Sequence, residues 1–185
     1  KNDNKILPLK LKQRIAVIGD FASSPRYQGH GSSRVVPTRQ DDLLTALEEL
    51  EVDFSYARGF DQNSDEPDPD LIAEALDTAG SADIAIVCIG LPDYAESEGF
   101  DRVDMKLPLS QRVLLDKLWT VQPRLVAVYF GGSPVELPWV NRFKAVLIAY
   151  LSGQATGTAV ARLLLGLANP CGKLAETWPL RLEDT

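Results

Sequence analysis

The sequence contains few of the residues on which several common kinds of site depend. Its 185 residues include only two cysteines, one histidine and one methionine. The cysteines are far apart in the sequence, so neither a disulfide framework nor the spacing of a metal site is present, and we expect Cys88, inside an apolar segment, to be buried and inert. A serine-hydrolase triad is disfavoured, because the chain lacks a Gly-x-Ser-x-Gly motif.

Long apolar runs and a basic surface are also absent. No apolar stretch approaches the roughly 20 residues that span a bilayer. The formal net charge of -7 argues against nucleic acid as a partner, because binding to phosphates requires a positive surface, and it favours a neutral or cationic ligand. The chain begins with Lys1 and has methionine only at Met105, so we expect a piece of a longer protein, whose cellular compartment the sequence does not indicate.

What the chain does contain is an alternation of short apolar segments with amphipathic ones. Apolar segments bounded by Gly, Pro and Asp are typical of buried parallel strands. Their alternation with helices predicts an α/β fold, a three-layer sandwich in which helices cover both faces of a mostly parallel sheet of about five or six strands. We expect residues 1–185 to form a single domain of this kind. The predicted strands are 14–19, 52–57, 83–90, 125–131 and 145–151, and the predicted helices are 41–50, 70–79, 110–121 and 156–167.

Punctuating residues support three of these helices. Asp68 followed by Pro69 is an N-cap with proline in the first helical position, and Ser110 can cap the third helix. Gly80 and Gly166 are natural stops for the second and fourth helices.

Two connections are longer than a compact fold requires. Residues 21–38 and 91–109 each follow a predicted strand, and long ordered loops in compact domains are usually functional. Both begin at carboxyl ends of strands, where open α/β sheets bind their ligands. A third polar stretch, residues 61–67, is expected to be a surface excursion with no specific role.

The connection 91–109 carries the densest ionisable group of the chain: Glu96, Glu98, Asp101 and Arg102. Like charge and burial raise the pKa of one such carboxyl while the arginine lowers that of another, which separates a proton donor from a stabilising anion. The pattern therefore permits acid chemistry. The alternative is a solvated loop whose acids pair with Arg102.

The connection 21–38 contains the sequence Gln-Gly-His-Gly-Ser-Ser-Arg at positions 28–34. It is not a dinucleotide fingerprint, because the strand ends about ten residues earlier and Val-Val-Pro follows where a helix is required. Such a segment brings backbone amides and small hydroxyls close to a ligand, including a sugar, and a permissive turn is the alternative. We take His30, Ser32 and Ser33 as candidates for substrate binding or loop support, with His30 as a residue that hydrogen-bonds a ligand or lies at the surface, in preference to a general base.

Two further features follow the last two predicted strands. A helix that begins after Gly153 and Gln154 can bind an anion at its N-terminus, although close packing of helix on strand explains Gly153 and Gly157 equally well. Trp139 and Trp178 can stack on a sugar face, and filling the edge of the core is the alternative that we favour for both.

Taken in order, these motifs closely resemble the second, α/β sandwich domain of family 3 glycoside hydrolases, the group of β-glucosidases and exo-β-glucanases. Each match is weak alone, and the ordered set is highly specific. The matching segments are Leu-Pro-Leu at 7–9, Ile-Ala-Val-Ile-Gly at 15–19, Gln-Gly-His-Gly-Ser-Ser at 28–33, Ala-Asp at 82–83, Glu-Ser-Glu-Gly-Phe-Asp-Arg at 96–102, Leu-Pro-Leu-Ser-Gln at 107–111, Gly-Ser-Pro-Val-Glu-Leu-Pro-Trp at 132–139, Gly-Gln at 153–154, Asn-Pro-Cys-Gly-Lys-Leu at 169–174 and Thr-Trp-Pro at 177–179.

The resemblance implies a retaining mechanism, without metal or cofactor, at a site built by two domains. In that family a TIM-like barrel ahead of this domain supplies the nucleophilic aspartate, and this domain supplies the general acid/base glutamate. Retaining hydrolysis uses two carboxyl groups about 5 to 5.5 Å apart. We therefore expect the parent protein to hydrolyse terminal β-linked sugars in a β-glucoside or oligosaccharide, and this chain alone, which lacks the barrel, to be inactive.

The same resemblance assigns the acid/base role to Glu98, because family members with Glu-Gly-aromatic-Asp-Arg place it directly before the glycine. Other members place it one or two positions earlier, which makes Glu96 the alternative. Asp101 and Arg102 are expected to hold the loop or to set the pKa of the acid. A carbohydrate-binding or interaction module without catalysis is the alternative function.

Overall fold

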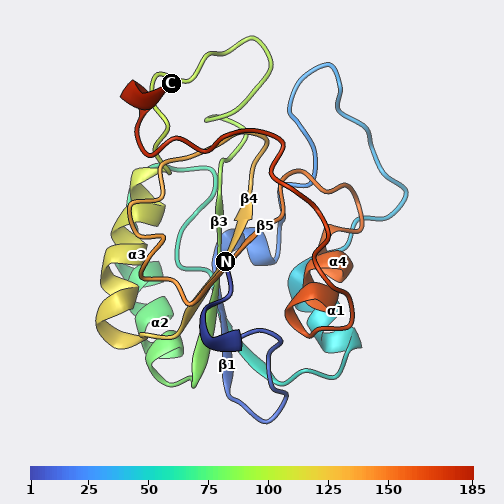
Figure 1. Cartoon of the computed structure of the whole chain (residues 1–185), viewed down its shortest axis with the longest axis vertical. Coiled ribbons are helices and arrows are strands. Elements are labelled where there is room, and N and C mark those ends of the chain that lie inside the picture. The colour runs from blue at the N-terminus through green and yellow to red at the C-terminus, as the bar shows by residue number, and fades with distance from the viewer.

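The molecule is a sheet of five parallel strands in the order β2-β1-β3-β4-β5, with helices on both faces. The computed structural model describes residues 1–185. Helices α2 and α3 lie on one face of the sheet, and α1 and α4 lie on the other (Figure 1). The predicted fold class is confirmed. The strands are β1 Ile15–Ile18, β2 Phe54–Ala57, β3 Ile84–Gly90, β4 Leu125–Phe130 and β5 Ala145–Ile148; the helices are α1 Leu43–Glu49, α2 Pro69–Gly80, α3 Leu109–Val121 and α4 Thr156–Leu164, with short 3-10 helices at Asp3–Lys5, Asp20–Ala22 and Leu182–Asp184.

Every predicted strand and helix is present, with ends that differ from the prediction by at most three residues. The largest difference in a strand is in β5, which ends at Ile148. Two residues later, Tyr150 adopts φ 52°, a left-handed conformation that cannot continue a strand. Helix α4 ends at Leu164, and Gly166 follows it at φ +73°, as its predicted role as a stop requires.

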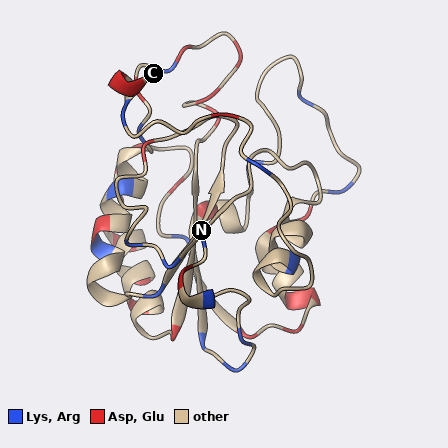
Figure 2. Cartoon of the chain, in the orientation of Figure 1, with Lys and Arg blue, Asp and Glu red and all other residues tan.

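The core is one apolar cluster of 39 buried residues that includes side chains from all five strands. Strands β1, β3 and β4 are buried along their whole length, because helices cover both of their faces. Each fully buried Leu or Ile contributes about 1.5 to 3 kcal/mol. Cys88 belongs to this cluster, as predicted, and burial raises the pKa of its thiol. Most charged residues lie on the outer helices and the loops (Figure 2).

The starts of α2 and α3 are capped in different ways. Asp68 caps α2 as predicted, and its Oδ1 accepts hydrogen bonds from the backbone N–H groups of Asp70 and Leu71 at 2.9 and 3.1 Å. The prediction that Ser110 caps α3 is wrong. The α3 N-terminus is capped by Asp65, whose carboxylate accepts from the Leu109 N–H and whose backbone oxygen accepts from the Ser110 N–H at 3.0 Å.

This contact also corrects the expectation for residues 61–67. That segment is not a surface excursion without a role, because it supplies the cap that the α3 sequence lacks. Pro108, the residue before α3, has no side-chain donor or acceptor and makes no capping hydrogen bond. The loop 61–67 therefore fixes the end of the long connection between β3 and α3.

The beginning of that connection is fixed by Gln111 of α3. Its side-chain amide donates to the Gly90 backbone oxygen and accepts from the Gly90 N–H, both at 2.9 Å. Gly90 itself allows the close approach of β4, since a Cβ atom there would lie 1.8 Å from the Phe130 oxygen. Both ends of the connection are thus tied to the start of α3.

The strand order places the two long connections side by side. From β1 the chain passes to α1 on one face, and from the neighbouring β3 it passes to α3 on the other face (Figure 1). A switch of this kind opens a crevice at the carboxyl ends of the two strands. The predicted candidate residues lie in the loops around this crevice.

Candidate functional site

Glu96 is a firmly bound carboxylate at the centre of the site. Its Oε2 lies 2.7 Å from Nη1 of Arg26 and accepts a hydrogen bond from the Gly132 N–H at 2.8 Å. Its Oε1 accepts from the Ser133 hydroxyl. The side chain is 19% exposed. Glu96 therefore links the loop after β1, the loop after β3 and the loop after β4.

Glu98, only two residues further on, lies in a different environment. Its carboxylate is exposed and accepts a hydrogen bond from the Ser32 backbone N–H, while its own N–H donates to the His30 oxygen at 3.0 Å. The hydrogen bonds from the Ser32 side chain and backbone lower the pKa of this carboxyl. Gly31 has φ +127°, and a Cβ there would lie 2.5 Å from the Glu98 Cβ, so this close approach requires glycine.

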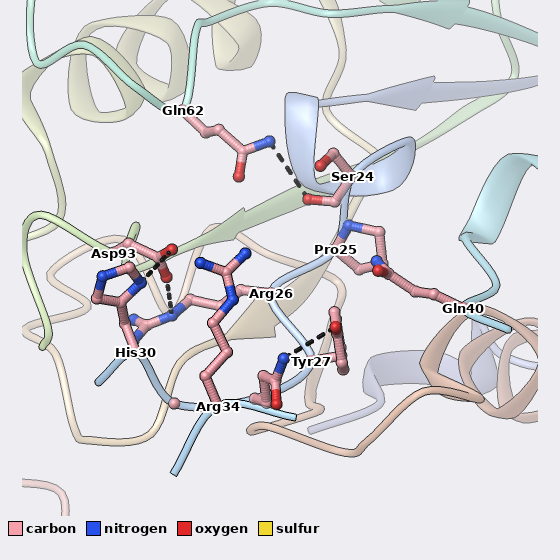
Figure 3. Close-up of a pocket in the computed structure, with 11 residues that line it drawn as sticks. Ser24, Pro25, Arg26, Tyr27, His30, Arg34, Gln40, Gln62 and Asp93 are labelled. Carbon is pink, nitrogen blue, oxygen red and sulfur yellow. Dashed lines mark hydrogen bonds and ion pairs between the residues drawn. The ribbon is translucent and has the colours of Figure 1, made fainter. Parts of the chain in front are cut away.

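His30, Asp93 and Arg26 form a connected group beside these glutamates (Figure 3). His30 Nδ1 lies 2.9 Å from Asp93 Oδ2, and Arg26 Nε lies 3.2 Å from Asp93 Oδ1. The carboxylate of Asp93 therefore bridges the only imidazole of the chain and a buried guanidinium. His30 is thus held by a partner on the opposite loop, and its side chain, 41% exposed, lines both cavities at this place.

Arg102 binds to the loop after β4. Its Nη1 donates to the Ser133 hydroxyl at 3.1 Å and to the Pro134 oxygen at 2.8 Å, and it forms no ion pair with any acid of its own loop. The expected alternative, in which the acids pair with Arg102, is therefore not found. The side chains of Asp101 and Ser33 are exposed and make no hydrogen bonds within the chain.

Two adjoining cavities lie at these loops. The larger, about 420 Å³, is lined by both glutamates together with His30, Asp101, Arg102 and Ser133. The smaller, about 190 Å³, shares Arg26, Gly29 and His30 with the larger one, and its lining is almost entirely polar (Figure 3). Of the predicted site residues, Glu96, Glu98, His30, Asp101 and Arg102 meet at the larger cavity, and Ser32 reaches it through its bond to Glu98.

The N-terminus of α4, expected to be able to bind an anion, already has one. The carboxylate of Asp41 accepts from the N–H groups of Gly157 and Thr158 at 2.8 and 3.1 Å and from the Thr158 hydroxyl. The expected packing of helix on strand is found at neither glycine. A Cβ on Gly157 would lie 2.2 Å from the Asp42 backbone, so this residue packs closely against the chain before α1, whereas Gly153 has φ +84° and no atom near its Cβ position. No ligand role remains for this helix end.

Trp139 and Trp178, the two tryptophans that could stack on a sugar, both lie against the core. Trp139 stacks on Trp119, with ring centroids 6.0 Å apart, and its Nε1 donates to Asp116 at 3.0 Å. Trp178 packs edge-on against Tyr129 at 5.3 Å. Neither lines the cavity of the glutamates. The favoured interpretation, that they fill the edge of the core, is confirmed.

The residues that could hold a metal are not gathered at the site. No group of three or more His, Cys, Asp or Glu side chains converges in a way that could bind an ion. The site is instead a set of carboxylates held by guanidinium, hydroxyl and backbone donors. Its two glutamate carboxylates differ in how firmly they are held: three donors bind Glu96, and only Ser32 binds Glu98.

Arg26, Asp93, Gly132 and Ser133 are parts of the site whose roles the sequence did not indicate. Arg26 follows Pro25 without belonging to any periodic pattern, and Asp93 stands outside the dense acidic group. The signal that could have found Arg26 is its place in the long loop after β1, directly before the glycine-rich segment. Gly132 and Ser133 were visible only as part of a motif after the fourth strand.

The fold and the site together define an α/β sandwich domain with a carboxylate-rich cavity at the switch point of its sheet. Comparison with known proteins gives the family. Residues 1–185 match the family described as "Glycosyl hydrolase family 3 C-terminal domain", and the chain belongs to this family.

The similarity to individual proteins extends over nearly the whole of this chain or all of it. Thermostable β-glucosidase B of Acetivibrio thermocellus is 48% identical over 186 residues, which span 99% of this chain and 25% of that protein. An exo-α-(1→6)-L-arabinopyranosidase of Bifidobacterium breve is 40% identical over 194 residues, spanning 100% of this chain and 26% of that protein. The crystal structure of a family 3 β-glucosidase from Bifidobacterium adolescentis matches with a TM-score of 0.95 and 42% identity, over 100% of this chain and 27% of that one.

The chain thus spans about a quarter of the length of these relatives. The match lies in the C-terminal domain by the family's own description. As for a membrane, none of the helices has the length and apolar character needed to cross one.

Proposed function

We propose that the chain is the second domain of a retaining β-glycosidase, in which Glu98 is the general acid/base for hydrolysis of terminal β-D-glucosyl residues. The observation that carries this proposal is the contrast between the two glutamates. Both oxygens of Glu96 are occupied by donors from Arg26, Gly132 and Ser133. Glu98 is exposed at the cavity, and Ser32 is the only residue bound to its carboxylate.

A general acid/base must exchange a proton with two partners in turn. It first protonates the departing oxygen and then takes a proton from the attacking water. A carboxylate bound by a guanidinium and two further donors is held in place and has little capacity to contact a substrate. The exposed carboxyl of Glu98 has that capacity.

The proposed role of Glu98 requires a further group that raises the pKa of its carboxyl. The hydrogen bonds from Ser32 favour the carboxylate, whereas a general acid must carry a proton when the substrate arrives. A second carboxylate about 5 to 5.5 Å away would raise the pKa of Glu98 by like-charge repulsion and would also serve as the nucleophile. We assign that carboxylate to a TIM-like barrel domain of the parent protein. This domain would correspond to part of the relatives' sequences outside the matched region.

The names of the relatives support more than one sugar. One is a β-glucosidase and another is an exo-α-(1→6)-L-arabinopyranosidase. The contrast between the glutamates is independent of the sugar, because the acid acts on the leaving oxygen. Turnover by the full-length protein of p-nitrophenyl β-D-glucoside and p-nitrophenyl α-L-arabinopyranoside, measured in parallel, decides between the two substrates. We expect the glucoside to be the better one.

The central experiment replaces Glu98 in the full-length protein. A general acid matters most when the leaving group is poor, so Glu98→Ala should slow hydrolysis of an alkyl glucoside by about 10²- to 10⁴-fold. The first step on an activated aryl glucoside should be affected far less. Azide should restore deglycosylation and yield the glycosyl azide, because this anion attacks the glycosyl-enzyme without a general base.

Glu96→Ala is the matched control. Because Glu96 joins three loops, its loss should displace the whole wall of the cavity and lower the activity on all substrates by a similar factor, without azide rescue. The opposite pattern would transfer the acid/base role to Glu96. If neither variant shows dependence on the leaving group, the acid/base does not lie in this loop.

A binding or interaction module without catalysis is the competing function. The 185-residue chain alone should not hydrolyse an aryl β-glucoside, because it lacks the second carboxylate. Turnover by this chain that disappears in Glu98→Gln would overturn the two-domain proposal. Calorimetric binding of glucose by the chain, with no leaving-group dependence in the full-length Glu98→Ala variant, would favour the binding module.

A further inference from the structure

Arg26 is an arginine whose burial needs an explanation. Its side chain is only 4% exposed, although a buried charge is costly unless it is paired and hydrogen-bonded. It lies in the loop after β1, outside every helix and strand.

The guanidinium of Arg26 binds one short segment of the neighbouring loop, residues 91–96. Its Nη1 donates to the Leu91 oxygen at 2.8 Å and to Glu96 Oε2 at 2.7 Å. Its Nη2 donates to the Glu96 oxygen, and its Nε faces Asp93 Oδ1 at 3.2 Å. Both Nη atoms thus donate to oxygens of this segment, while Nε faces Asp93 as an ion pair without a hydrogen bond. A lysine ammonium, which lacks this planar fork of donors, cannot make the same set of contacts.

From this segment a second set of contacts leads to Glu98. Asp93 holds the His30 ring at 2.9 Å through its other oxygen (Figure 3). The His30 backbone oxygen then accepts the Glu98 N–H at 3.0 Å, and the neighbouring Ser32 N–H binds the Glu98 carboxylate. Asp93 and His30 therefore join Arg26 to the backbone that holds Glu98.

We infer that Arg26 is a positioning residue for Glu98, which it orients through Asp93 and His30. This inference rests on the proposed acid/base role of Glu98. Loss of Arg26 leaves the bonds of Glu96 to Gly132 and Ser133 in place, so the wall at the loop after β4 keeps its contact. We therefore expect the loss of Arg26 to disturb the connection through Asp93 and His30 to Glu98 more than the contact with the loop after β4.

A double-mutant cycle in the full-length protein tests the inference. Arg26→Ala should lower kcat for an alkyl glucoside by about 10- to 100-fold, part of the contribution of a general acid, with a much smaller loss for the first step on an activated aryl glucoside. In the Glu98→Ala background the same substitution should cause little further loss, because residues that act through one group are not additive. A merely structural arginine would lower the activity in both backgrounds equally.

Two further variants keep the test interpretable. Arg26→Lys keeps the charge but not the fork of donors, so it should show a similar dependence on the leaving group even if Arg26→Ala folds poorly. Guanidinium at millimolar concentration should restore activity to Arg26→Ala by occupying the vacated position. Arg58→Ala is the matched control, because Arg58 also binds a buried carboxylate, Asp20 at 2.9 Å, and its loss should be additive with Glu98→Ala.

The outcomes separate this inference from the proposed function. If Glu98→Ala shows leaving-group dependence and azide rescue while Arg26→Ala is additive with it, Arg26 is structural and the inference fails alone. If Glu98→Ala shows neither signature, the proposed function fails first. Non-additivity together with guanidinium rescue supports both.

Discussion

The two halves of the loop between β3 and α3 are held in opposite ways. The first half, residues 91–96, is bound by the buried guanidinium of Arg26 and by the Ser133 hydroxyl. In the second half, residues 97–108, Phe100 and Val103 are 76% and 91% exposed, and the attachments of Glu98 and Arg102 are a few hydrogen bonds. The chain becomes buried again only at Met105 and Leu107, close to the start of α3. Within one loop, the first half is thus firmly anchored, and the second half carries the exposed carboxyl of Glu98. The anchored first half fixes the position at which the second half begins.

The difference between the two halves is tested most directly by removing a carboxylate from each half and measuring the free energy of unfolding. Glu96→Ala removes the main anionic partner of a buried arginine, which typically costs about 3 kcal/mol in the free energy of unfolding. Glu98→Ala removes an exposed group and should change stability little. Urea unfolding of the 185-residue chain, followed by circular dichroism, gives both values. Equal losses would show that the two halves are held alike.

The far end of the second half can be loosened at Asp65. Asp65→Ala removes the carboxylate that caps α3 and should cost about 1 kcal/mol. Ser110→Ala is the control, because the Ser110 hydroxyl makes only a 3.3 Å bond to the Ser64 oxygen. Thermal unfolding should rank Asp65→Ala below Ser110→Ala. The reverse order would restore Ser110 as the residue that supports the helix start.

The smallest expected effect concerns the titration of Glu98. Because Ser32 lowers the pKa of the folded-state carboxyl, the stabilisation is present above the unfolded-state pKa of about 4.3 and is lost as the pH falls through the lower folded value. Ser32→Ala should move the Glu98 pKa upward, toward that ordinary value. Titration of the Glu98 side-chain carboxyl by NMR measures the shift. A pKa that stays unchanged would show that the Ser32 side chain does not hold this carboxylate.

The fold could be predicted because its signals are local. Short apolar segments such as 83–90, bounded by Asp and Gly, carry enough pattern to specify a buried strand, and Asp68 lies directly beside the helix that it caps. The cap of α3 could not be predicted, because Asp65 lies 44 residues before Leu109 in the sequence. Ser110 was predicted as the cap because it is next to the helix start in the sequence. In the folded chain, Asp65 supplies the acceptors for the N–H groups at that start.

In the candidate site, too, the features with local sequence signals could be predicted, and those that depend on distant residues could not. The acidic loop after β3 and the glycine-rich loop after β1 were visible as local groups of residues, and strand order explains why they meet. The separation of Glu96 from Glu98 was not visible, because it depends on Arg26, which lies 70 residues before Glu96. A lone arginine in a loop has no periodicity that indicates burial. Only the folded chain shows which of the two glutamates it binds.

The cap of α4 has a consequence for the order in which the molecule assembles. Helix α4 has nine residues, too few to be stable in isolation, and the carboxylate at its start belongs to Asp41, which lies 116 residues before Gly157. Closing a segment of that length carries an entropy cost that must be met before the contact stabilises the helix. We therefore expect helix α4 to form late in folding, after the segment before α1 has reached its place.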